Sequence, residues 1–226
     1  MTKVFYIGDS TVQFNRIDTY PQTGMSQVLP IFTREGIAVC PHGKNGRSTK
    51  SFLDEGLFEP VDQQMEAGDF LLIQFGHNDE KADPARHTDP FSSYQENLRF
   101  FIREAREKGA YPVLVTPIAR RLFDGDGRFQ PGSHGQYPEA MRQLGKEEKV
   151  PVADLTALTE AFLAGLGDEA SRPLFVWPVD NTHLKYDGAV AMVRFLCREL
   201  ERFGPPYSDL LHDPTKTEYF INDEVF

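Results

Sequence analysis

Short, uninterrupted runs of apolar residues recur along this chain, separated by segments in which apolar residues follow a helical spacing. The runs predict five strands, at residues 3–7, 37–40, 70–74, 111–116 and 150–153. None of the runs alternates apolar and polar residues, which is typical of parallel strands that are covered on both faces.

Two long segments between the runs carry apolar residues at spacings of three and four, which predicts amphipathic helices. Residues 91–108 precede Gly109, and residues 188–203 follow Asp187, a candidate N-cap. Strands that alternate with helices through right-handed crossovers predict an α/β protein. We expect a three-layer α/β/α sandwich around a five-stranded parallel sheet.

Length and composition fit one domain with a sizeable core, since 40% of the 226 residues are hydrophobic and 26% are charged. We expect a single domain over residues 1–226, with residues 204–226 as a C-terminal tail. The formal net charge of −10 argues against a nucleic-acid partner and against an anionic membrane surface. Cys40 and Cys197 are expected to be separate buried thiols.

The first residues contain only four consecutive apolar positions, from Val4 to Ile7. This is too short for the core of a secretory signal, and no apolar run approaches the length of a membrane span. We expect a soluble cytoplasmic protein, or a secreted one if a signal peptide has been removed. No Cys/His spacing typical of a metal site occurs, and the sequence leaves the oligomeric state open.

Polar segments follow the predicted strands at their carboxyl ends, where α/β sheets bind ligands. Gly8-Asp9-Ser10 places a serine after the first strand. A serine hydroxyl becomes a nucleophile when a base takes its proton. If the strand runs into a helix, its amide also faces a developing negative charge. The alternative is a plain turn, because Gly, Asp and Ser are all turn formers.

The second predicted strand is followed by residues 42–48, in which two glycines leave the Gly46 amide free to approach a ligand closely. The alternative is a strand-to-helix turn with Ser48 as the N-cap.

The third predicted strand is followed by Gly76-His77-Asn78-Asp79, and the Asn78 side-chain amide can donate a hydrogen bond to an oxyanion. The alternatives are an Asx turn or a metal site made by His77 and Asp79.

Asp180-Asn181-Thr182-His183 lies just before the last predicted helix. A carboxylate at this spacing can accept the imidazole Nδ1–H, which leaves Nε2 free to act on Ser10. The alternative is a surface loop with an isolated histidine. Taken together, the four segments supply the parts that a serine hydrolase needs.

The same four segments resemble the conserved blocks of the SGNH (GDSL-type) hydrolases, in order and at similar spacing. The resemblance implies the flavodoxin-like SGNH fold, with Ser10 as nucleophile, His183 as base and Asp180 orienting the histidine. It also implies an oxyanion hole made by the amides of Ser10 and Gly46 and by the Asn78 side chain. No metal and no organic cofactor is expected.

Longer segments look similar to the rhamnogalacturonan acetylesterase branch of these hydrolases. They are residues 8–11, 45–52, 75–79, 115–118, 120–124 and 134–137. This narrower resemblance implies a serine esterase that removes O-acetyl groups from pectin-derived sugars through an acetyl-serine. The expected partner is an acetylated oligosaccharide or another small acetyl ester. Most fungal members are secreted and carry disulfides. This chain shows neither a signal nor paired cysteines, so it looks more like the intracellular bacterial members, and an imported oligosaccharide is then the expected substrate.

Pectin galacturonate carries a carboxylate that a planar guanidinium can bind through two hydrogen bonds. Arg47, Arg120 and Arg121 flank the expected site, and His77 is a further candidate for its lining. The alternative for the arginines is a set of solvated charges or structural ion pairs.

Three other functions stay open. One is an acetylxylan or general small-ester acetylesterase, which the sequence does not separate from a pectin enzyme. Another is a lysophospholipase or thioesterase, although the loops are rich in polar residues and show no apolar groove for a long acyl chain. The last is a flavodoxin-like binding module without catalysis, but the chain has no glycine-rich phosphate loop.

Overall fold

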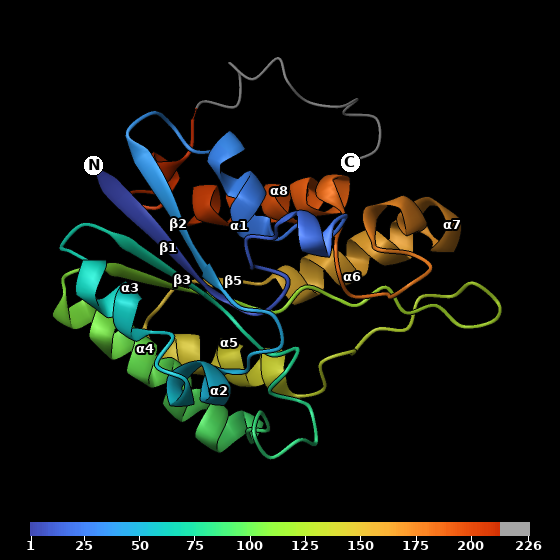
Figure 1. The fold of residues 1–226 in the computed structure, drawn as a ribbon, viewed down its shortest axis with the longest axis horizontal. Coiled ribbons are helices and arrows are strands. Elements are labelled where there is room, and N and C mark those ends of the chain that lie inside the picture. The colour runs from blue at the N-terminus through green and yellow to red at the C-terminus, as the bar shows by residue number, and fades with distance from the viewer. Residues whose placement is uncertain (213–226) are drawn as a thin grey trace.

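The computed structural model describes residues 1–212 and shows the predicted α/β/α sandwich (Figure 1). The parallel sheet has the strand order β2-β1-β3-β4-β5. The strands are β1 (Thr2–Gly8), β2 (Ile37–Gly43), β3 (Phe70–Gln74), β4 (Tyr111–Val115) and β5 (Val152–Ala153).

Helices connect the strands and cover both faces of the sheet. The α-helices are α1 (Met25–Val28), α2 (Thr49–Asp54), α3 (Glu59–Gln64), α4 (Gln95–Glu107), α5 (Tyr137–Glu148), α6 (Leu155–Leu166), α7 (Asp168–Ser171) and α8 (Tyr186–Phe203). Single 3₁₀ or π turns lie at Ile17–Thr19, Leu29–Ile31, Pro90–Tyr94, Arg172–Leu174 and Ser208–Leu210.

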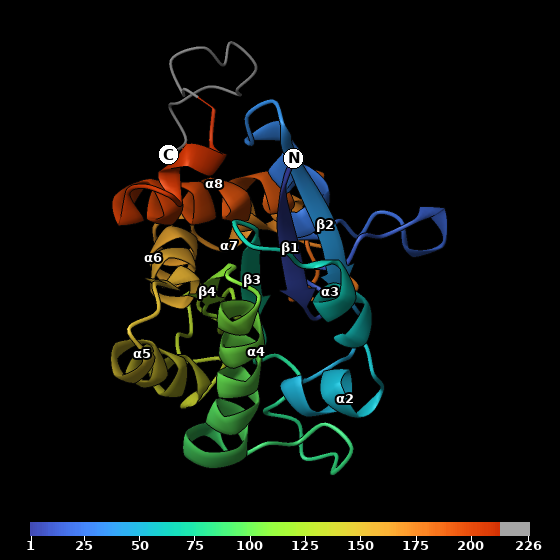
Figure 2. The ribbon, with the colours of Figure 1, turned by 90° about the vertical axis from the view of Figure 1, so that its left-hand side faces the viewer.

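Successive residues of a β-strand point to opposite faces of the sheet, so they belong to two different hydrophobic cores. Val4 and Tyr6 of β1 belong to the core on the side of α1, α6 and α8, whereas Phe5 and Ile7 belong to the core on the side of α2, α4 and α5. Figure 2 shows these two groups of helices on opposite sides of the sheet. Burial on both faces explains why the strands are continuously apolar.

Several predicted boundaries were wrong, each for a local reason. β2 continues to Gly43 because it pairs with β1 as far as Gly8. β5 begins only at Val152, since Pro151 has no N–H to donate to a neighbouring strand. Asp187 is not the N-cap of α8: Lys185 holds that position, and Asp187 lies in the first turn, where its charge suits the helix dipole.

Two further expectations concern segments outside the sheet. The predicted helix at residues 91–108 is a π turn followed by α4, and Gly109 ends it at φ 73°. Part of the predicted tail packs back on the domain, because the Arg34 amide donates to Leu210 and Leu210 is buried. Residues 213–226 of that tail lie outside the described residues. Within residues 1–212, no helix has both the length and the hydrophobicity to span a bilayer.

The strand register brings the ends of β1, β2 and β3 to one level of the sheet. Gly8 pairs with Gly43 on one side and with Gln74 on the other. Gly8 must be glycine, because a Cβ there would lie 2.4 Å from the Gln74 carbonyl oxygen. The loops after these three strands therefore start next to one another.

Asp79 joins two of these loops from inside the protein. Its Oδ1 accepts hydrogen bonds from the Thr49 amide at 3.0 Å, the Thr49 hydroxyl at 2.6 Å and the Thr88 hydroxyl at 3.0 Å. Burial raises the pKa of Asp79 from 3.8 to about 7, and these hydrogen bonds offset the effect only in part. This carboxylate holds the start of α2 against the loop after β3.

The raised pKa of Asp79 predicts a pH dependence of stability. Between pH 4 and 7 the folded protein keeps a proton that the unfolded chain has lost, so this contribution to stability declines as the pH rises. From pH 5 to 8 the wild type should lose about 2 to 3 kcal/mol more unfolding free energy than Asp79→Asn. Urea denaturation at several pH values measures this, with Asp126→Asn on an exposed loop as the control. Parallel stability curves for wild type and Asp79→Asn would contradict the prediction.

Candidate active site

The structure brings Ser10, Asp180 and His183 into one hydrogen-bonded chain at the carboxyl ends of the strands. His183 Nε2 lies 3.0 Å from Ser10 Oγ, and His183 Nδ1 lies 2.9 Å from Asp180 Oδ2. The carboxylate accepts only, so Nδ1 carries the ring proton and Nε2 is the free base that accepts from the serine hydroxyl.

Backbone amides of its own loop orient the Asp180 carboxylate for this contact. Its Oδ1 accepts from the Thr182 amide at 2.8 Å and from the His183 amide at 2.7 Å. Burial acts to raise the pKa of Asp180, but the hydrogen bonds from His183 and Thr182 outweigh it and the pKa is lowered. The carboxylate is therefore ionised at neutral pH and can stabilise a positive charge on His183.

Ser10 lies in a tight turn that Asp9 organises. The Asp9 carbonyl accepts from the amides of Val12 and Gln13, and its Oδ1 accepts from the amide and the hydroxyl of Thr11. No α-helix follows β1 directly, since the next one, α1, begins at Met25. The expected helix N-terminus at Ser10 was wrong, and the turn itself orients the Ser10 amide.

Gly46 and Asn78 lie in the same cavity as Ser10. Within residues 1–212, neither the Ser10 amide nor the Gly46 amide has a hydrogen-bond acceptor. Gly46 has φ 76°, a conformation that an L side chain adopts at a cost. Both amides are therefore available to an anionic ligand.

Ser48, two residues later, caps α2 through a hydrogen bond from the Ser51 amide, so the capping alternative holds for that residue.

Asn78 is held by partners on both ends of its amide. Its Nδ2 donates to the Arg47 carbonyl at 3.1 Å, and its Oδ1 accepts from Arg86 at 3.4 Å. The opposite orientation of the amide would place donor against donor and acceptor against acceptor. One N–H of Nδ2 is left for a third donor to the cavity. Sequence analysis missed Arg86, which lies eight residues beyond Asn78 in a polar loop.

Below the cavity, a buried polar cluster supports the turns that carry Ser10 and Asn78. His77 Nδ1 lies 3.2 Å from Asp9 Oδ2, with both side chains at most 3% exposed. Burial lowers the pKa of His77 more than the Asp9 carboxylate raises it, so the ring is neutral at neutral pH. This contact joins the residue before Ser10 to the residue before Asn78. Since Asp79 turns toward Thr49 and Thr88, the predicted metal alternative for His77 and Asp79 has no support here.

A second layer of the cluster comes from the long loop between β4 and α5. The His134 ring packs edge-on against the His77 ring, with the two ring centres 4.4 Å apart. His134 Nε2 lies 2.8 Å from the Ile118 carbonyl oxygen, and His134 Nδ1 lies 3.1 Å from the Glu80 carboxylate. Burial acts to raise the pKa of Glu80, but His134 and Arg120 outweigh it and the pKa is lowered. These contacts fix the loop after β3 from below.

Of the residues predicted to bind substrate, His77 and Arg120 line the cavity and two arginines do not. Arg47 pairs with Glu55 through Nε and one terminal nitrogen, at 2.9 and 2.8 Å. Arg121 is buried, with Asp168, Ser171 and Asn181 as partners. Both are structural ion pairs, the alternative that the sequence had left open.

Arg121 supports the loop that carries Asp180 and His183. Its amide donates to the Asn181 carbonyl at 2.8 Å, and its guanidinium lies 4.6 Å from the centre of the Trp177 ring. The guanidinium also donates to the Asp168 carbonyl at 2.7 Å. These contacts span more than 45 residues of sequence, so no local pattern reveals them.

The cavity around Ser10 has a volume of about 310 Å³ and a polar lining. The lining consists of Ser10, Gln22, Asn45, Gly46, His77, Asn78, Lys81, Arg120, Asp180, Thr182 and His183. It contains no aliphatic side chain and no phenyl or indole ring. Such a cavity suits a small acyl group on a hydroxyl-rich alcohol better than a long alkyl chain.

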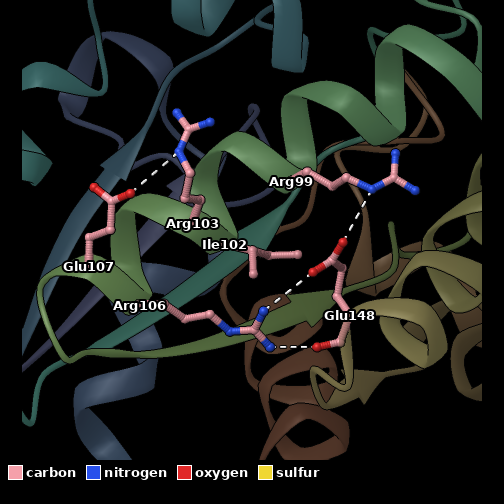
Figure 3. Close-up of a pocket in the computed structure, with 6 residues that line it drawn as sticks. All are labelled: Arg99, Ile102, Arg103, Arg106, Glu107 and Glu148. Carbon is pink, nitrogen blue, oxygen red and sulfur yellow. Dashed lines mark hydrogen bonds and ion pairs between the residues drawn. The ribbon is translucent and has the colours of Figure 1, made fainter.

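A second cavity, of about 510 Å³, lies between α4 and the end of α5 (Figure 3). Its arginines Arg99 and Arg106 both pair with Glu148, and Arg103 pairs with Glu107. No serine, cysteine or histidine lines it, so it has no group suited to acyl transfer.

The fold and the site together define a carboxylic ester hydrolase of the α/β/α class. The sequence profile of the GDSL-like Lipase/Acylhydrolase family matches residues 6–189, and the chain belongs to this family. Among curated proteins, the chain is 41% identical to the rhamnogalacturonan acetylesterase RhgT of Bacillus subtilis (strain 168). That alignment covers 92% of this chain and 94% of the relative.

Two solved structures share the fold. The protein YxiM of Bacillus subtilis superposes with a TM-score of 0.79 at 26% identity, over 91% of this chain and 58% of that longer chain. The acetylxylan esterase Axe2 of Geobacillus stearothermophilus superposes with a TM-score of 0.65 at 20% identity. The second match covers 88% of this chain and 93% of Axe2, and at this identity it bears on the fold alone.

The role of Arg121 as a support for the His183 loop is testable. Arg121→Met removes the arginine that donates to Asn181 and leaves Asp168 with Arg172 alone, which should lower the melting temperature on the order of 5 °C. Scanning fluorimetry measures the shift. The control is Arg128→Met, because Arg128 is 76% exposed and pairs with an exposed aspartate. Equal melting temperatures for the two variants would contradict this role.

Proposed function

We propose that this chain is a serine acetylesterase that removes O-acetyl groups from pectin-derived oligosaccharides, with Ser10 as the nucleophile. The observation that carries the proposal is the contact chain from Asp180 through His183 to Ser10. Beside it lie the Ser10 and Gly46 amides, which have no acceptor within residues 1–212, and the second N–H of Asn78 Nδ2. The 41% identity to a rhamnogalacturonan acetylesterase supports the choice of substrate.

The first step forms an acetyl-enzyme. Ser10 Oγ attacks the acetyl carbonyl carbon while His183 Nε2 takes the hydroxyl proton. The oxyanion is stabilised by the Ser10 amide, the Gly46 amide and the Asn78 side chain. When the ester C–O bond breaks, His183 returns the proton to the departing sugar oxygen.

The second step regenerates the enzyme. A water molecule gives its proton to His183 Nε2 and attacks the acetyl carbon, through an oxyanion held by the same donors. Ser10 leaves with the proton from His183, and acetate is released. His183 must be neutral to start either step, because only the neutral ring can take a proton.

The polar lining of the cavity supports an acetyl ester over a long-chain ester. A lysophospholipase or thioesterase would need apolar side chains along its acyl chain, and the lining has no aliphatic side chain and no phenyl or indole ring. The sugar hydroxyls of an oligosaccharide can instead bond to Gln22, Asn45 and Thr182.

Acetate release tests the substrate. The substrates are acetylated rhamnogalacturonan oligosaccharides, acetylated xylo-oligosaccharides, an aryl acetate and an aryl octanoate. We expect the highest kcat/KM among the oligosaccharides for the rhamnogalacturonan substrate and little octanoate hydrolysis. Equal rates on both oligosaccharides would indicate a general acetylesterase. No release from either, by folded protein, would contradict the proposal.

Variants test the assigned roles in the same assay. Ser10→Ala should lose about 10⁴-fold or more in kcat, because no nucleophile remains. Asn78→Ala should lose about 10²–10³-fold, because one of three oxyanion donors is gone. Circular dichroism and melting temperature serve as controls for folding. An Asn78→Ala variant with unchanged kcat would remove Asn78 from the oxyanion hole.

A further inference from the structure

We propose that the Lys81 ammonium binds the carboxylate of a uronate unit near the ester under attack, which makes Lys81 a specificity-determining residue. This inference rests on the proposed function, since it says how the same site recognises an acidic sugar. Lys81 lines the cavity together with Ser10, Asn78 and His183.

The charges in the cavity lining single out Lys81. The other cation, Arg120, donates to the Glu80 carboxylate and to the His77 carbonyl, so its charge is offset inside the protein. Within residues 1–212, the Lys81 ammonium makes no ion pair and no hydrogen bond. By contrast, Lys50 donates to the Pro84 carbonyl and Lys108 pairs with Asp62.

The carboxylate in the cavity lining, that of Asp180, already has hydrogen-bond partners inside the protein. Asp180 accepts hydrogen bonds from the ring and the amide of His183 and from the Thr182 amide. The positive charge of Lys81 is thus left for a ligand. This matters because the chain carries a formal net charge of −10, which repels an anionic oligosaccharide at long range.

The backbone of Lys81 is fixed relative to the proposed oxyanion donor. The Lys81 amide donates to the Asn78 carbonyl at 3.1 Å, and the Lys81 carbonyl lies 3.0 Å from His87 Nδ1. The flexible four-carbon stem ends in a point charge that accepts a carboxylate in several orientations. It can therefore bind a neighbouring sugar without fixing the geometry of the reacting ester. This predicts a contribution to substrate binding, seen in KM, and not to kcat.

The test compares an acetylated galacturonate-containing oligosaccharide with the same oligosaccharide after reduction of its carboxylates. The variants are Lys81→Met, Lys81→Arg and the control Lys146→Met, which removes the same charge from the exposed face of α5. We expect Lys81→Met to lower the kcat/KM preference for the charged substrate about tenfold through KM. Lys81→Arg should restore most of the preference, and Lys146→Met should match the wild type.

A second readout does not depend on sugar deacetylation. Unacetylated galacturonate oligomers should inhibit aryl acetate hydrolysis by wild type, and about tenfold more weakly in Lys81→Met. Equal loss of kcat/KM on charged and reduced substrates, or inhibition equal to that of wild type, would overturn the inference. Failure of wild type to deacetylate either oligosaccharide would instead contradict the proposed function, and the inhibition assay would then still decide whether Lys81 binds a carboxylate.

Discussion

The site of this hydrolase depends on one contact, the 3.0 Å hydrogen bond between His183 Nε2 and Ser10 Oγ, across 173 residues of sequence. A change of about 1 Å in such a contact is enough to lower turnover strongly. Both partners lie on loops, and a loop holds a position only as well as its own contacts allow. The protein meets this need from inside, through Asp9 beneath Ser10 and Arg121 behind His183.

The sheet supplies the coarse alignment and buried polar groups supply the fine alignment. Pairing of Gly8 with Gly43 and Gln74 starts three loops at one level. The cluster of Asp9, His77 and His134 then supports the turns that leave this level, through the 3.2 Å contact between His77 Nδ1 and Asp9 Oδ2 and the edge-on packing of the two imidazole rings. An apolar support could bury as much surface but would not specify where Ser10 and Asn78 lie.

Much of this architecture was predictable from the sequence, because continuous apolar runs reveal strands buried on both faces and small polar blocks mark their ends. Ser10, Gly46, Asn78, Asp180 and His183 all come together as expected. The supporting charges were not predictable. The sequence around a loop arginine does not show whether its side chain is solvated, as that of Arg128 is, or buried against a distant aspartate, as that of Arg121 is. The prediction of Asp187 as the N-cap of α8 was wrong for a similar reason, because the N-cap residue depends on where the preceding loop joins the helix.

The measurement that tests the account most directly is covalent labelling with a fluorophosphonate, followed by peptide mass mapping. Such a probe reacts with a serine whose proton is taken by a neighbouring base and whose surroundings stabilise an oxyanion. The account predicts one adduct per chain, on Ser10, formed much more slowly in His183→Ala and absent from Ser10→Ala. An adduct on another residue, or no adduct on folded wild-type protein, would contradict the claim that Ser10 is the nucleophile.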